Sequence, residues 1–144
     1  MESTQHAAHI VMIDDNASDV YLLRYALNQL HEPYELEVLR DGEAALAFVN
    51  SHRTQTDEPR PCVIVLDLHL PRYDGLSVLR AIKKEPTLAH IHVVILTAQA
   101  SPEEEAEMLR LGVNLYRAKP SNLEELTSVA AEILDVCKEP VLVS

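Results

Sequence analysis

Short apolar runs and longer segments with apolar residues at helical spacing alternate along the chain. The runs occupy residues 9–13, 34–39, 62–66, 92–96 and 113–118. Those at 9–13, 62–66 and 92–96 are almost uniformly apolar, which is typical of strands covered by helices on both faces of a parallel sheet. The run at 34–39 alternates apolar and charged residues, as an edge strand often does. The pattern predicts five strands.

The segments between and after these runs predict five helices, because their apolar residues recur three or four positions apart. The stripes expected to face the core are Val20, Leu23, Leu27 and Leu30; Ala45, Phe48 and Val49; Leu76, Leu79 and Ile82; Ala106, Leu109 and Leu111; and Leu126, Val129, Ile133 and Val136. Strand and helix thus alternate five times. This order predicts a doubly wound α/β domain with a five-stranded parallel sheet, in which ligands bind at the carboxyl ends of the strands.

Local signals mark several ends and connections. Ser101, followed by a proline and three glutamates, predicts the start of the fourth helix, and Gly112 predicts its end. The connection over residues 50–61 is polar and contains two prolines, which indicates an exposed loop. The Asp74-Gly75 pair is typical of a turn.

Length and charge limit the classes of protein to consider. At 144 residues the chain is long enough for one domain. We expect that domain at residues 9–138, with short tails at 1–8 and 139–144. Twelve Lys and Arg against 23 Asp and Glu give a net charge of −11. Such a charge repels phosphate backbones, so we expect no direct binding of nucleic acid.

The sequence also suggests a cellular compartment. No apolar stretch approaches the roughly 20 residues of a membrane span, and residues 1–10 lack the basic and apolar regions of a leader. Only Cys62 and Cys137 are present, too few for a disulfide framework, and Cys62 opens an apolar run where a buried free thiol is expected. We therefore expect a cytoplasmic protein with no membrane association.

Polar side chains follow four of the predicted strands. The first strand ends at Asp14-Asp15, the third at Asp67, the fourth at Thr97 and the fifth at Lys119. Because the carboxyl ends of parallel strands meet at one edge of a sheet, these groups are expected to lie close together. An Asp at such a position is often only the N-cap of the next helix, a role open to Asp15 or Asn16.

These residue types suit phosphoryl chemistry. Three clustered carboxylates raise one another's pKa unless a counter-charge is present. Mg²⁺ supplies such a charge, since it takes oxygen ligands and is usually held by one or two carboxylates together with a phosphate. A hydroxyl from Thr97 and an ammonium from Lys119 suit the spread negative charge of a phosphoryl group in transfer. The cluster indicates an aspartate that receives a phosphoryl group.

Four motifs resemble the receiver domain of bacterial two-component response regulators. They are IDDN at 13–16, LDLHLPRYDG at 66–75, ILTA at 95–98 and YRAKP at 116–120. The resemblance covers about residues 10–137 and implies the flavodoxin-like (βα)5 fold. By this similarity Asp67 is the phosphoacceptor, and Asp14 and Asp15 are the acidic pair that binds Mg²⁺. The main-chain carbonyl of His69 is implied as a further metal ligand.

The same resemblance implies a conformational switch. Thr97 matches the switch hydroxyl, Lys119 the invariant lysine, and Tyr116 the aromatic residue that rotates as the switch engages. From its position alone, Tyr116 could equally be a packed residue. The family also implies a cis bond between Lys119 and Pro120.

A narrower similarity is to stand-alone receivers that partner bacterial and cyanobacterial phytochrome histidine kinases. It implies a phosphorelay protein that accepts its phosphoryl group from a histidine kinase, here one of the phytochrome type. Residues 138–144 are too few for a DNA-binding effector, so output is expected through protein contacts. These include a homodimer through the fourth helix, fifth strand and fifth helix. The chain is expected to modify only itself and to turn over no free substrate, so we do not expect it to be an enzyme.

Two other functions fit the residues less well. An aspartyl phosphatase needs a second acid two residues after its nucleophile, where this chain has His69. A degenerate receiver, acting as an adaptor without phosphorylation, would not require the complete set of Asp67, Thr97 and Lys119. In the family, the side chains two positions after the phosphoacceptor and after the switch hydroxyl flank the path of attacking water. We expect His69, with no evident partner, to shield the phosphoryl group, and Gln99 to supply no base.

Overall fold

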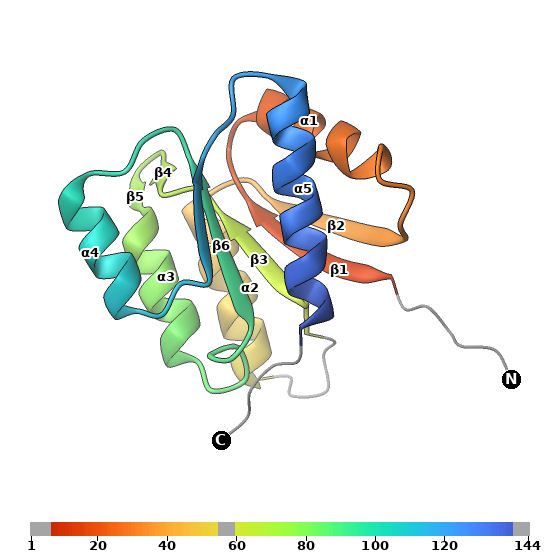
Figure 1. The fold of residues 1–144 in the computed structure, drawn as a ribbon. Coiled ribbons are helices and arrows are strands. Elements are labelled where there is room, and N and C mark those ends of the chain that lie inside the picture. Colours follow the sequence, from red (N-terminus) through yellow and green to blue (C-terminus); the bar gives the residue numbers. More distant parts are fainter. Residues whose placement is uncertain (1–6, 55–59, 140–144) are drawn as a thin grey trace, which may run out of the picture.

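The computed structural model describes residues 7–54 and 60–139, which form a parallel sheet surrounded by helices (Figure 1). The sheet has five strands in the order β2-β1-β3-β6-β7, all parallel. Its strands are β1 (Ala8–Ile13), β2 (Tyr34–Leu39), β3 (Val63–Leu66), β6 (His92–Thr97) and β7 (Leu115–Ala118). The helices are α1 (Ala17–Asn28), α2 (Gly42–Thr54), α3 (Gly75–Lys84), α4 (Pro102–Arg110) and α5 (Leu123–Lys138). The predicted doubly wound α/β fold is confirmed.

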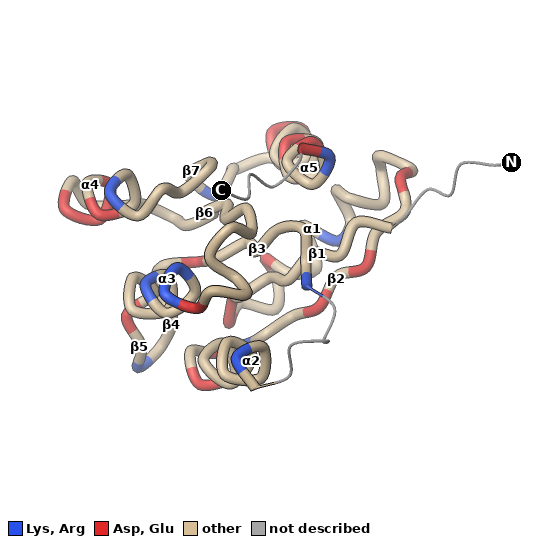
Figure 2. The backbone as a smooth tube through the Cα atoms, turned by 90° about the horizontal axis from the view of Figure 1, so that it is seen from below, with Lys and Arg blue, Asp and Glu red and all other residues tan. Residues whose placement is uncertain are grey.

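Helices cover both faces of the sheet, which explains the apolar character of its central strands. Helices α1 and α5 lie on one side, with α2 and α3 on the other (Figure 2). Along β1, Ile10 and Met12 pack against α1 and α5, whereas Val11 and Ile13 pack against α2 and α3. Because successive strand residues point to opposite faces, a strand buried on both sides needs apolar residues at every position.

Helix α4 begins as predicted but presents a different stripe to the core. Ser101 is its N-cap, in a capping box with Glu104, and Gly112 has a φ of 77° just after its end. The expected stripe is wrong, because Met108 is buried whereas Leu109 is 81% exposed. A helix of nine residues contacts the core through little more than one side chain, so its rotation is set by tertiary packing.

A small antiparallel hairpin follows β3 and was not predicted. It comprises β4 (His69–Leu70) and β5 (Tyr73–Asp74). The Asp74-Gly75 pair is not a separate turn, because Asp74 ends β5 and caps α3, which starts at Gly75. A Cβ at Gly75 would lie 2.4 Å from the backbone of Leu68, so only glycine allows the helix to start this close.

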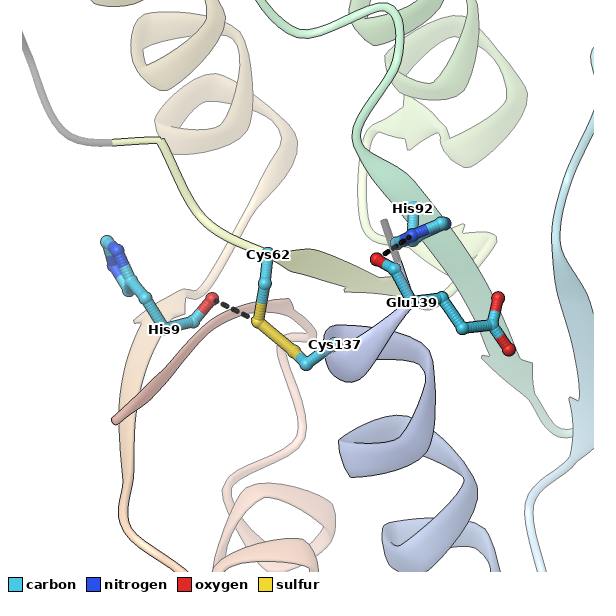
Figure 3. Close-up of a disulfide and its surroundings, with 5 residues drawn as sticks. All are labelled: His9, Cys62, His92, Cys137 and Glu139. Atoms are coloured by element: carbon cyan, nitrogen blue, oxygen red, sulfur yellow. Dashed lines mark hydrogen bonds between the residues drawn. A yellow bond between two sulfur atoms is a disulfide. The ribbon is translucent and has the colours of Figure 1, made fainter. Parts of the chain in front are cut away.

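Two connections differ from expectation. Helix α2 continues to Thr54, so the first part of the expected loop at 50–61 is helical, and residues 55–59 lie outside the described part. The expected free thiol is also wrong, because Cys62 and Cys137 form a disulfide (Figure 3). Packing of α5 beside the start of β3 brings the two Cα atoms within 5.1 Å, although 75 positions separate the cysteines in sequence. Cysteine usage therefore no longer supports a reducing compartment.

Within the described ranges, no helix combines the length and the apolar character needed to cross a membrane.

Candidate functional site

The polar residues predicted at the strand ends lie together at the carboxyl edge of the sheet. Asp14 and Asp15 follow β1, Asp67 follows β3, and Thr97 is the last residue of β6. Backbone hydrogen bonds extend the sheet one residue further on two strands. The Asp67 N–H donates to Ile13 O (3.0 Å), and the Lys119 N–H donates to Thr97 O (2.8 Å). The strand register thus fixes where these side chains start.

Asp67 is the centre of the cluster. Its Oδ1 accepts hydrogen bonds from Thr97 Oγ1 (2.7 Å) and from the backbone N–H of His69 (3.0 Å). Its Oδ2 accepts one from Lys119 Nζ (2.8 Å). Asp67 is only 5% exposed and Thr97 is fully buried. The carboxylate is therefore held in one orientation by a hydroxyl, an amide and an ammonium.

Lys119 contacts three carboxylates. Its Nζ lies 2.8 Å from Asp67 Oδ2, 3.1 Å from Asp14 Oδ2 and 2.5 Å from Asp19 Oδ2. Burial alone would lower the pKa of Lys119, but the hydrogen bonds to Asp19 and Asp67 and the charge of Asp14 outweigh it and raise the pKa. Asp19 was not predicted as a site residue. An acid in the first turn of a helix is already explained by its favourable interaction with the helix dipole. The sequence therefore gives no sign that Asp19 contacts Lys119.

Three carboxylates of the cluster are arranged as a metal site. Asp14, Asp15 and Asp67 offer oxygens that all lie within 4.8 Å of one another. Burial raises the pKa of Asp14, and the contact of its buried Oδ2 in the described ranges is the ion pair with Lys119 Nζ at 3.1 Å. Asn16 is the N-cap of α1, so Asp15 is not needed for that role. Three carboxylates that share one ammonium form an all-oxygen donor set, which fits a hard divalent cation.

His69 has partners that the sequence did not reveal. Its Nδ1 lies 3.4 Å from Thr97 Oγ1, and its Nε2 lies 3.6 Å from Glu104 Oε2 at the start of α4. The expectation of an unpartnered ring is therefore wrong, because the loop before α4 brings Glu104 over the site. Gln99 is exposed. An open hollow beside the cluster is lined by Asp15, His69 and Glu104, among others, whereas Asp14 and Asp67 are buried.

The remaining two predicted features lie in β7 and directly after it. Tyr116 is half-buried and lines a shallow groove with Met108 and Leu109 of α4. The bond between Lys119 and Pro120 is trans, so the expected cis bond is wrong. Proline lowers the energy difference between the two isomers, and the residue types therefore do not decide which one is present.

A doubly wound sheet with three acids, a threonine and a lysine at its carboxyl edge defines the receiver class of signalling domain. Residues 10–131 match the family of the response regulator receiver domain, and the chain belongs to this family. Response regulator Rcp1 of Synechocystis sp. is 38% identical over 117 residues, covering 81% of this chain and 80% of Rcp1.

Solved structures give the same result. The phosphorylated cyanobacterial phytochrome response regulator RcpA superposes with a TM-score of 0.81 at 33% identity, over 93% of this chain and 96% of that one. The Mn²⁺-bound form of Rcp1 has a TM-score of 0.79 at 35% identity, over 95% of this chain and 99% of that one. The chain is thus a receiver similar to phytochrome response regulators, as its motifs predicted.

Proposed function

We propose that Asp67 accepts a phosphoryl group from a phosphohistidine of a histidine kinase. A carboxylate oxygen of Asp67 attacks the phosphorus, a P–O bond forms, and the P–N bond to the imidazole breaks. The observation that carries this proposal is the position of the Asp67 carboxylate between Thr97 Oγ1 and Lys119 Nζ, beside two further acids. The modified group belongs to the protein itself, so no free substrate is turned over.

In this proposal Lys119 and Thr97 respond to the new charge. The Lys119 ammonium binds a phosphoryl oxygen, and the Thr97 hydroxyl leaves its bond with Asp67 to donate to another. Tyr116, half-buried beside β6, would follow Thr97 and alter the groove that it lines with Leu109. The conformational change would then extend to the face formed by α4, β7 and α5.

The metal is proposed to be Mg²⁺. Asp14, Asp15, Asp67 and the main-chain carbonyl of His69 would hold it. When bound, it neutralises the clustered carboxylates and the charge that develops on the phosphoryl group. The chain's own contribution is the fixed placement of these oxygens at the ends of β1 and β3.

Replacing Asp15 by Asn should weaken Mg²⁺ binding severely, because a charged ligand becomes a neutral one at the most accessible position of the site. Calorimetric titration measures the affinity. Glu35→Gln, an exposed carboxylate on β2 outside the cluster, is the matched control and should bind Mg²⁺ like wild type. Equal affinities for Asp15→Asn and wild type would remove Asp15 from the metal site.

The proposed partners are a histidine kinase of the phytochrome type and a second copy of this chain. Similarity to phytochrome response regulators supports the first. The second is supported by Leu109, exposed beside the groove on the face of α4 and β7. Output would use protein contacts and no direct nucleic-acid contact. Sedimentation showing only monomer, with and without phosphorylation, would exclude the dimer.

The proposed working unit is a stand-alone receiver at residues 9–138, with tails at 1–8 and 139–144, acting in the cytoplasm. The chain covers 96% of the RcpA chain and 99% of the Rcp1 chain, which supports the proposed bounds of the receiver. The decisive experiment is transfer from phosphorylated histidine kinases with Mg²⁺ present, followed by intact-protein mass spectrometry. Gain of one phosphoryl group that is lost in hot acid or base is expected, and no transfer from any kinase or small-molecule donor would refute the proposed function.

Replacing His69 by Asn should speed dephosphorylation severalfold. The imidazole, held between Thr97 and Glu104, is placed to block water from the phosphoryl group, and an amide covers less of that path. Decay of phosphorylated protein in buffer after donor removal gives the rate. His90→Asn, which makes the same change at an exposed histidine just before β6, at the opposite edge of the sheet from the cluster, is the comparison variant. Slower decay in His69→Asn would mean that the histidine assists water.

A further inference from the structure

Lys119 has more anionic partners than the proposed reaction requires. An ammonium has three N–H donors, and here Asp14, Asp19 and Asp67 each place an oxygen within 3.1 Å of Nζ. Two of these partners, Asp14 and Asp67, also belong to the metal site. Asp19 does not. Among the described residues it is therefore the carboxylate that contacts Lys119 while lying outside the metal cluster.

We propose that Asp19 is a positioning residue that retains the Lys119 ammonium at the edge of the sheet when a divalent cation occupies the acidic cluster. This proposal rests on the metal site in the proposed function. It assigns Asp19 no contact with the phosphoryl group or the cation.

The physical reason is competition between two positive charges for the same oxygens. A cation that takes oxygens from Asp14 and Asp67 weakens two of the three contacts of Lys119 and repels its ammonium. Asp19 still supplies a full negative charge at hydrogen-bond distance. Without Asp19, the ammonium would have only Asp14 and Asp67 as partners, and it would compete with the cation more strongly.

Asp19 is well placed for this role. It is the third residue of α1, and its backbone N–H donates to the N-cap side chain of Asn16 (3.1 Å), which fixes the first turn over the carboxyl edge of the sheet. Its side chain is 27% exposed, against 6% for Asp67.

A double-mutant cycle with Mg²⁺ affinity as the readout tests the proposal. Wild type, Asp19→Asn, Lys119→Met and the double variant are titrated with Mg²⁺ by calorimetry. Asp19→Asn should lower the affinity severalfold, because the released ammonium competes for Asp14 and Asp67. Lys119→Met should raise the affinity. In the Lys119→Met background, the Asp19→Asn change should have little effect, since no ammonium is left to hold.

Two controls separate this role from simpler ones. Glu124→Gln removes another first-turn acid, on α5, and should leave Mg²⁺ affinity unchanged. This control tests whether the loss of any acid near a helix N-terminus lowers the affinity through the helix dipole. Asp19→Glu keeps the charge and should recover most of the affinity. Equal losses from Asp19→Asn in both backgrounds would overturn the proposal, because Asp19 would then act only as a nearby negative charge.

The outcomes also separate this proposal from the proposed function. An additive cycle in a protein that binds Mg²⁺ and accepts phosphoryl groups would refute the role of Asp19 alone. Absence of Mg²⁺ binding in wild type would refute both the proposed metal site and the role of Asp19.

Discussion

The Asp67→Asn variant is expected to accept no phosphoryl group from a histidine kinase or from a small-molecule donor. An amide is a poor nucleophile compared with a carboxylate, and its NH₂ group cannot accept the hydrogen bond that Lys119 Nζ now donates to Asp67 Oδ2. Among the three acids of the cluster, only Asp67 contacts both Thr97 and Lys119. No other aspartate is expected to replace it.

Intact-protein mass spectrometry after incubation with donor and Mg²⁺ measures this loss. Asp135→Asn is a suitable control, because it removes an exposed carboxylate on α5 far along the chain from the cluster and should leave phosphorylation unchanged. An undiminished phosphate on Asp67→Asn would show that a different residue is modified.

Loss of the Cys62–Cys137 disulfide should lower the free energy of unfolding more than any other change predicted for this protein. The bond closes a loop across 75 positions, for which the chain-entropy model gives about 4 kcal/mol of stabilisation. For a domain of 144 residues, that corresponds to a decrease in Tm of about 13 °C. Cys137→Ser should show this decrease relative to oxidised wild type.

Calorimetric scans of wild type with and without a reductant, together with Cys137→Ser, measure the effect. The reductant should lower the Tm of wild type toward that of the variant and leave the variant unchanged. Alkylation under denaturing conditions counts free thiols, and none is expected in oxidised wild type. Two alkylated cysteines, with a Tm insensitive to reductant, would contradict the disulfide.

The fold was largely predictable because its signals are local. Uniformly apolar runs identified the central strands, and Ser101 and Gly112 marked both ends of α4. The phase of that helix was not predictable, since spacing alone does not distinguish Met108 from Leu109 as the buried residue in so short a segment. The two-residue strands of the hairpin are shorter than any pattern that sequence periodicity can detect.

The site was predictable as far as the ends of parallel strands determine it. Asp67, Thr97 and Lys119 meet because the register of β3, β6 and β7 brings their ends together. Residues from other elements were missed. Asp19 and Glu104 both lie in the first turn of a helix, where an acid already has a sufficient local explanation. The disulfide was missed because no local signal relates residues 75 positions apart.

The two ends of β3 carry different chemistries, and this separation has a practical use. Cys62 precedes the strand and Asp67 follows it, so about 16 Å of extended chain lies between them. The disulfide (Figure 3) lies at the start of β3, so a fluorophore or a surface tether coupled to Cys62 or Cys137 after reduction would lie at the opposite edge of the sheet from the acidic cluster. The native cysteines therefore offer attachment points for an immobilised sensor whose acidic edge faces the solution.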